Sequence, residues 1–297
     1  VVTKSGGNNF SGAAQAYYTN ENMAEVIMPE EALETLGLSK PEFAKYDWET
    51  SGTLGGPIFR DRLWFLGNFR LARQTRYGTF RPTVILGKKY DTYDWIYNQY
   101  WGFLKLTTQL RENVRAFFML SYHKQHRPNI NRAWYLTKEA NTDHHTNAWT
   151  GTGNINWTLD ANTFIDARYG FWYFNFDGYP PVEDVIGQPS FIDGYTSYRW
   201  GYPGLSGFTR KRVAQGSVKL TRFQDDFLGG DHEFKAGFEI DRSSGMWGFY
   251  KPNPITWYYY NGNLYYYRGL YGINSVSYTH LRAHETRHDL VCRLLLE

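Results

Sequence analysis

The feature that most constrains this chain is an alternation of apolar and polar residues with a period of two. In residues 149–158, Trp149, Ile155 and Trp157 alternate with threonines and asparagines. Successive side chains of a strand point to opposite faces, so this pattern predicts a strand with one apolar and one polar face. The pattern recurs in residues 63–71, 114–123, 165–173, 215–221 and 232–241. Helical periodicity is weak nearly everywhere, and the sequence therefore predicts an all-β fold.

The connections between these segments alternate between short and long. Tight turns are predicted at residues 59–62, 110–113, 159–162 and 226–231, and long linkers at about 19–47, 75–98, 124–148 and 178–207. Long structureless loops are uncommon in a compact soluble domain. Transmembrane β-barrels have short periplasmic turns and long extracellular loops, and their strands of about 9–11 residues cross the bilayer at a tilt. The sequence thus favours an antiparallel transmembrane β-barrel, with a soluble carbohydrate-binding β protein as an alternative.

The composition fits a wall with two different faces. Aromatic residues make up 19% of the chain, with Tyr 25, Phe 20 and Trp 11, yet the mean hydropathy is −0.58. A high aromatic content together with a polar mean hydropathy is typical of barrels with an aromatic girdle at each membrane interface. The net charge of +3 is too small to indicate binding of nucleic acid. No apolar run approaches the length of a transmembrane helix.

Two segments near the start of the chain resemble a known family. Residues 1–12, VVTKSGGNNFSG, resemble the passage from the last plug strand into the first barrel strand of TonB-dependent outer-membrane receptors. Residues 51–67, SGTLGGPIFRDRLWFLG, resemble the second strand, periplasmic turn and third strand of the Oar-like branch, whose members often carry a carboxypeptidase-regulatory-like domain. By strand layout the resemblance extends to about residue 275.

The resemblance implies a domain division. Family members are closed barrels of about 22 strands with a plug folded inside, whereas about nine or ten strands are predicted here. Residues 1–9 are interpreted as the last residues of the plug and residues 10–275 as the N-terminal part of the barrel. The chain starts within a strand-like run, so we expect it to begin inside a longer protein. The chain alone is not expected to transport.

The resemblance also implies a function in the bacterial outer membrane. Family members take up an extracellular ligand with energy relayed by a periplasmic coupling protein that contacts the plug. Here the ligand stays open among an oligosaccharide, a peptide and a metal chelate. A non-transporting adhesin or assembly protein on the same scaffold is the alternative. We expect lipid around the wall, no cofactor and no enzymatic activity.

The C-terminal residues differ in character from the rest. Residues 276–297 lose the alternation, and residues 277–288 resemble translated sequencing-library adapter, so we interpret this tail as non-native. His280, His284 and His288 are spaced four apart and would share one face of a helix, a spacing that could suit zinc. Because they fall in the tail, we predict no metal site there. The single cysteine, Cys292, also lies in the tail, so no disulfide is expected within the chain.

Aromatic clusters outside the alternating segments are the candidate ligand-binding residues. Aromatic faces can stack on sugars and peptides, and Tyr198, Trp200, Trp257 and Tyr259 are the residues we select for this role. An interfacial girdle is the alternative for the same clusters. His144 and His145 are adjacent in a predicted long loop, where neighbouring side chains point apart. A metal site there would need a further ligand from elsewhere, so we predict exposed loop residues and no metal site.

Overall fold

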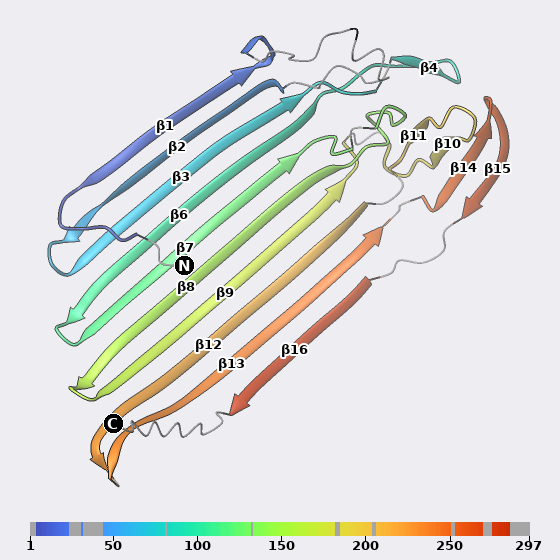
Figure 1. Cartoon of the computed structure of the whole chain (residues 1–297). Coiled ribbons are helices and arrows are strands. Elements are labelled where there is room, and N and C mark those ends of the chain that lie inside the picture. Colours follow the sequence, from blue (N-terminus) through green and yellow to red (C-terminus); the bar gives the residue numbers. More distant parts are fainter. Residues whose placement is uncertain are drawn as a thin grey trace.

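A ten-stranded antiparallel sheet, here called the wall, dominates the computed structural model (Figure 1). The structure describes residues 4–23, 31, 44–80, 82–131, 133–181, 185–203, 206–227, 229–250 and 253–269, and the backbone of 275–285. The wall strands are β1 (Ser11–Asn20), β2 (Ala44–Phe59), β3 (Leu63–Arg76), β6 (Trp95–Arg111), β7 (Val114–Arg127), β8 (Asp143–Asp160), β9 (Thr163–Tyr179), β12 (Ser206–Phe227), β13 (Gly230–Tyr250) and β16 (Ser275–Glu285). A 3-10 turn, η1 (Glu21–Met23), follows β1.

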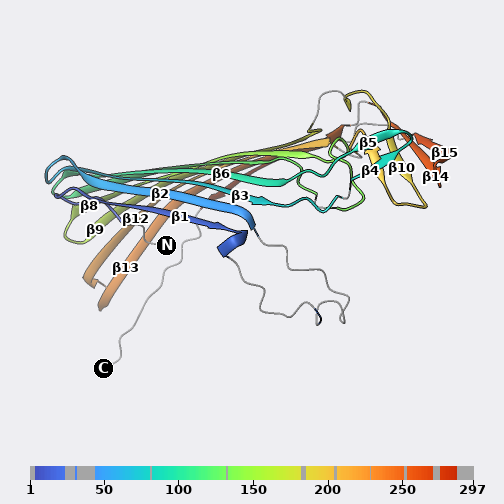
Figure 2. The same cartoon turned by 90° about the horizontal axis from the view of Figure 1, so that it is seen from above.

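Within the described strands, each wall strand pairs with the next one along the chain, and β1 and β16 form the two edges. The predicted antiparallel arrangement and the number of strands are confirmed. The sheet is curved rather than flat (Figure 2). Among the described residues, no helix is long and apolar enough to cross a membrane.

The predicted runs of about 9–11 residues or a little more are the inner parts of longer strands in most of the wall. β12 has 22 residues and β13 has 21. Their pairing continues from the short turn as far as Ser206 and Tyr250. The strand pairing extends this far because the backbone N–H and C=O groups of polar residues also need hydrogen-bond partners, and pairing with the neighbouring strand supplies them. The ends of the segments expected to be linkers are therefore strand.

The short turns lie where they were predicted. β2 and β3 are joined by a turn at Asp61, whose φ of 61° is left-handed. The side-chain oxygen of Asn8 accepts hydrogen bonds from Asp61 N at 3.0 Å and from Trp64 Nε1 at 2.7 Å. These contacts tie the N-terminal segment to the short-turn end of the wall.

The register gives the wall one apolar and one polar face. Residues paired directly across neighbouring strands share a face, and Ile155 pairs with Ala116 and with Ala167. Two successive rows on this face are almost wholly apolar. They are Leu63, Thr108, Ala116, Ile155, Ala167, Val218 and Phe238, then Phe65, Leu106, Phe118, Gly153, Tyr169, Gly216 and Ile240. On the other face Asn154 donates to Asp166 Oδ2 at 2.9 Å, so the predicted alternation is confirmed.

Six further strands lie in the long connections. β10 (Ser190–Asp193), β11 (Arg199–Gly201), β14 (Ile255–Tyr260) and β15 (Asn263–Gly269) form a four-stranded sheet in the order β11-β10-β14-β15. β4 (Thr83–Ile85) and β5 (Lys88–Tyr90) form a separate hairpin. All six gather at the end of the wall opposite the short turns (Figures 1 and 2).

β16 falls almost entirely within the segment interpreted as a tail. Its backbone pairs with β13 from Ser275, opposite Gly248, to Glu285, opposite Phe238. His280 and His284 therefore lie in a strand, and the helical face on which they would have shared a metal does not form there. His288 and Cys292 lie outside the described residues, as do Val1 to Thr3 of the predicted plug segment. The non-native origin of residues 276–297 stays a prediction.

Candidate ligand-binding loop assembly

The long connections pack into one body, here called the loop assembly (residues 77–80, 82–94, 128–131, 133–142, 180–181, 185–203 and 253–269). Its core is a cluster of four buried rings, Phe80, Tyr90, Tyr93 and Trp200, with 2–8% of each residue exposed. Phe80 and Tyr93 stack with ring centroids 6.1 Å apart. Rings from separate connections meet here, so the loops are held by side-chain burial as well as by backbone pairing.

Buried hydrogen bonds fix the connections to one another. Tyr93 Oη donates to the carbonyl of Leu136 at 2.7 Å and accepts from Asn141 Nδ2 at 3.0 Å. Asn141 is fully buried, and its amide also bonds Asn131 through both its oxygen and its nitrogen. Burial raises the pKa of Tyr93 to about 12, against the opposing effect of the Asn141 hydrogen bond. The phenol is therefore neutral and stays a donor at neutral pH.

Asp193 joins β10 to the β14–β15 hairpin. Its Oδ1 accepts from the backbone N–H groups of Tyr195 and Thr196 at 2.8 and 3.1 Å, and its Oδ2 accepts from Gly262 N at 2.9 Å. Burial alone would raise the pKa of Asp193, but the backbone hydrogen bonds from Gly262, Thr196 and Tyr195 outweigh it and lower the pKa. The ionised carboxylate is thus a structural element of the four-stranded sheet.

The structure brings three of the four selected aromatics together. Trp200 stacks on Phe191 at 5.4 Å and 11°, and its centroid lies 5.4 Å from the Tyr259 ring. Tyr198 packs on the buried Phe80 at 5.9 Å. Trp200 is only 7% exposed, so its main contacts are within the core. The role of these residues in ligand binding stays a prediction.

The fourth residue, Trp257, belongs to an aromatic surface on the β14–β15 hairpin. Trp257 lies 5.5 Å from Tyr267, and Tyr258 stacks on Tyr266 at 4.4 Å with an angle of 7°. Tyr267 is 67% exposed. The hairpin pairs within the four-stranded sheet and not within the wall. A girdle on the wall strands therefore does not describe these rings. They form two pairs on opposite faces of the hairpin, Trp257 with Tyr267 on one face and Tyr258 with Tyr266 on the other.

Sequence reasoning missed the core of the assembly. Phe80, Tyr90 and Tyr93 lay in a stretch expected to be a linker, although Leu86 and Gly87 form a two-residue turn with φ of 48° and 83° between β4 and β5. Gly87, which lies between the strand-forming residues Val84-Ile85 and Tyr90, could have predicted a hairpin here. The contacts between distant loops had no such signal.

The prediction that His144 and His145 are exposed loop residues is wrong. Both are half-buried and lie in β8, which begins at Asp143. They do point apart, as expected for a strand. The His144 ring packs edge-on against Phe176 at 4.7 Å, while the His145 ring stacks on His126 of β7 at 4.3 Å.

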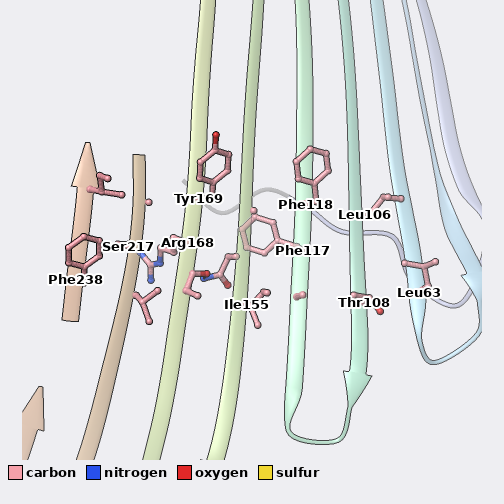
Figure 3. A pocket seen from close by; sticks show the side chains of 17 residues that line it. Leu63, Leu106, Thr108, Phe117, Phe118, Ile155, Arg168, Tyr169, Ser217 and Phe238 are labelled. Carbon is pink, nitrogen blue, oxygen red and sulfur yellow. The ribbon is translucent and has the colours of Figure 1, made fainter. Parts of the chain in front are cut away.

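A shallow groove of about 660 Å³ runs over the apolar face of the wall (Figure 3). Gly153 and Gly216 carry no side chain, and the surface is hollow between neighbours such as Phe118 and Tyr169. The lining is almost wholly apolar, and a site for a soluble ligand normally carries a few converging polar groups. The groove therefore does not resemble a site for a polar ligand.

Comparisons with known proteins agree with this architecture. A family model described as "Outer membrane beta barrel domain" matches residues 2–89. Among solved structures, the outer membrane transporter YddB from Escherichia coli is similar over 93% of this chain, with a TM-score of 0.56 and 10% sequence identity. The fold is that of an outer-membrane β-barrel wall. No curated protein matches the chain.

These findings place the chain in the bacterial outer membrane, as predicted. The apolar face of the wall meets lipid, and the loop assembly belongs to the extracellular side, where barrel loops are long. The chain spans 36% of the length of the YddB chain.

Proposed function

We propose that this chain forms part of the wall and outer loops of a TonB-dependent receptor that takes up an extracellular ligand. The observation that carries the proposal is the path of the N-terminal segment. Residues 4–8 cross β3 and β6 on the polar face of the wall (Figure 1). A plug inside a barrel would have to join the wall from this side.

The contacts of this segment are close. Lys105 Nζ donates to the carbonyl of Lys4 at 3.3 Å, and Thr107 Oγ1 donates to Ser5 Oγ at 3.4 Å. Lys105 and Thr107 are only 7% and 4% exposed. A Cβ at Gly6 would lie 2.2 Å from the carbonyl oxygen of Phe65, so only glycine fits this approach. The segment thus lies directly on the interior surface of the wall.

The loop assembly supplies a surface on which an extracellular ligand can stack. Its buried core and the Asp193 hydrogen bonds hold the β14–β15 hairpin in place. Rigid supports make binding stronger because less conformational freedom is lost when the ligand binds. The neighbouring rings of Trp257 and Tyr267, tilted by 43° to each other, suit a sugar, a peptide or an organic metal chelate.

The proposal is tested by binding of the coupling protein. The intact protein, purified from outer membranes in detergent, is titrated by calorimetry with the periplasmic domain of its host's energy-coupling protein. A TonB-dependent receptor binds this domain saturably. A folded protein that shows no heat of binding at any concentration would contradict the proposal and favour an adhesin on the same scaffold.

The stacking surface is tested with defined probes. Cells that express the intact protein are screened for binding of soluble oligosaccharides, short peptides and ferric chelates. For the probe that binds, we expect Trp257→Ala to weaken binding about tenfold, the loss of roughly one aromatic contact. Trp48→Ala is the matched control, because Trp48 is a partly exposed tryptophan of the wall strand β2 and lies outside the loop assembly. Equal effects of the two changes would contradict a specific role for the hairpin.

A further inference from the structure

Three metal-ligating side chains converge where β7 ends and β8 begins. The ligand atoms of His126, Asp143 and His145 all lie within 4.8 Å of one another. The convergence is built into the sheet, because His126 and His145 are directly paired in register across β7 and β8. Asp143 is two residues before His145 and so faces the same side of the strand. Of the adjacent histidine pair, His145 alone thus gains two further ligands, while His144 points to the opposite face.

The geometry leaves a gap of metal size between the groups. Asp143 Oδ2 lies 3.7 Å from His126 Nε2, which is too far for a hydrogen bond. Ligand atoms about 2.0–2.2 Å from a tetrahedral zinc ion stand roughly 3.3–3.5 Å apart. To hold a common ion, the ligand atoms, which lie within 4.8 Å of one another, need to approach by at most about 1.5 Å, with the His126 and His145 rings turning out of their stacked arrangement.

The carboxylate is already oriented by a neighbour. Asp143 Oδ1 accepts a hydrogen bond from the backbone N–H of Asn129 at 2.8 Å, which leaves Oδ2 directed toward His126. Hydrogen bonds of this kind fix a ligand before the metal arrives and raise its affinity. The side chain of Asp143 is 17% exposed and that of His126 is 34% exposed, so the cluster is sheltered yet accessible.

The position of the cluster favours a site in water rather than in lipid. It lies on the outward face of the wall, the face that carries Trp149, but four residues beyond Trp149 toward the long loops. Four strand residues correspond to about 13 Å. Asp177 pairs with His145 in the next strand, but its carboxylate is bound to Arg210 at 2.5 Å. Three protein ligands then leave a fourth position open.

We propose that His126, Asp143 and His145 bind a divalent transition-metal ion of the zinc class at the extracellular end of the wall. Two imidazoles and one carboxylate are ligands that suit Zn²⁺, and three protein ligands with an open position leave room for water or an external donor. This site is separate from the stacking surface of the β14–β15 hairpin and does not depend on the uptake function.

The test uses Zn²⁺ itself as the probe. The intact protein in detergent is first treated with chelator and then titrated with Zn²⁺ in competition with a chromogenic chelator. We expect one equivalent to bind, and we expect His126→Gln, Asp143→Asn and His145→Gln each to weaken binding at least about tenfold. Titration with Co²⁺ gives a second readout, a visible absorption band that all three changes reduce.

His144→Gln is the matched control, since His144 is the same residue type, adjacent in sequence and directed to the opposite face. It should leave both Zn²⁺ affinity and the Co²⁺ band unchanged. Heat-modifiable migration on gels verifies that every variant is folded. Absence of Zn²⁺ binding by the folded wild-type protein, or an equal loss in His144→Gln, would overturn the proposal and leave only a stacked histidine pair beside a carboxylate.

Discussion

The wall and the loop assembly are stabilised by different physics. Among the described residues, Ala72 is the one buried hydrophobic side chain of the wall, whereas Phe80, Tyr90, Tyr93, Leu136, Ala140, Val185, Trp200 and Tyr202 lie in or beside the loops. The wall satisfies its backbone by pairing and places its apolar side chains outward, toward lipid. The loop assembly stands in water and buries a core of its own. The wall is thus stabilised as a membrane protein is, and the loop assembly as a water-soluble domain is.

The largest expected effect is on the loop core. Trp200→Ala should destabilise the loop assembly by about 3–5 kcal/mol, because it removes a nearly buried indole and leaves a cavity. The wall should stay folded, since its ladder does not pass through Trp200. Hydrogen exchange measured by peptide should therefore rise in residues 77–94 and 185–203 and stay unchanged in the paired wall strands.

Trp134→Ala serves as the control for that experiment. Trp134 is 49% exposed, so its replacement should lower the stability of the loop assembly far less. If Trp200→Ala instead unfolds wall and loops together, the two regions form one cooperative unit and the comparison fails.

A slightly smaller effect is expected from a charge on the lipid-facing side. Val218 and Ser217 are neighbours in β12 on opposite faces of the wall. Val218→Lys should cost about 2–4 kcal/mol, because it places a charge in the centre of the apolar band. Ser217→Lys should change stability by less than about 0.5 kcal/mol, since it faces water beside Glu239. Urea unfolding from lipid vesicles, followed by tryptophan fluorescence, measures both, and equal costs would argue against lipid on this face.

The third prediction concerns pH and the loop assembly alone. The folded-state pKa of Asp193 is lowered, so its stabilisation is present above the unfolded pKa and is lost as pH falls through the folded value. Hydrogen exchange of β14 and β15 should therefore accelerate in acid more than that of the wall. Asp193→Asn should weaken the sheet by about 1.5–3 kcal/mol at neutral pH and remove this acid dependence. An unchanged acid dependence in the variant would assign it to another group.

The difference between the regions also explains what could be foreseen. Strand alternation such as Trp149 to Thr158 and the turn at Asp61 are local signals, and they predicted the wall, its two faces and its short turns. The loop core depends on contacts such as Tyr93 with Leu136, 43 residues apart, which no local period encodes. The same holds for His126 and His145, whose meeting is a consequence of register. All four selected aromatics lie in the loop assembly, but the pattern could not separate the buried Trp200 from the half-buried Trp257.

The smallest effect tests whether the hairpin surface is held by its own stacking. Tyr266 stacks face to face on Tyr258, and such a pair contributes about 0.5–1.5 kcal/mol beyond burial. Tyr266→Leu should raise hydrogen exchange in β14 and β15 to a matching degree, while Tyr265→Leu, at a ring that is 75% exposed, should have less effect. The wall offers a counterpart in Tyr122 and Trp149, with centroids 4.4 Å apart. In the hairpin, pairing also removes apolar ring surface from water, which adds a hydrophobic contribution to stability. The rings of Tyr122 and Trp149 already face lipid and gain no such contribution, so Tyr122→Leu should lower the free energy of unfolding less than Tyr266→Leu. The reverse order would mean that packing between rings, and not the solvent around them, sets the stability of both regions.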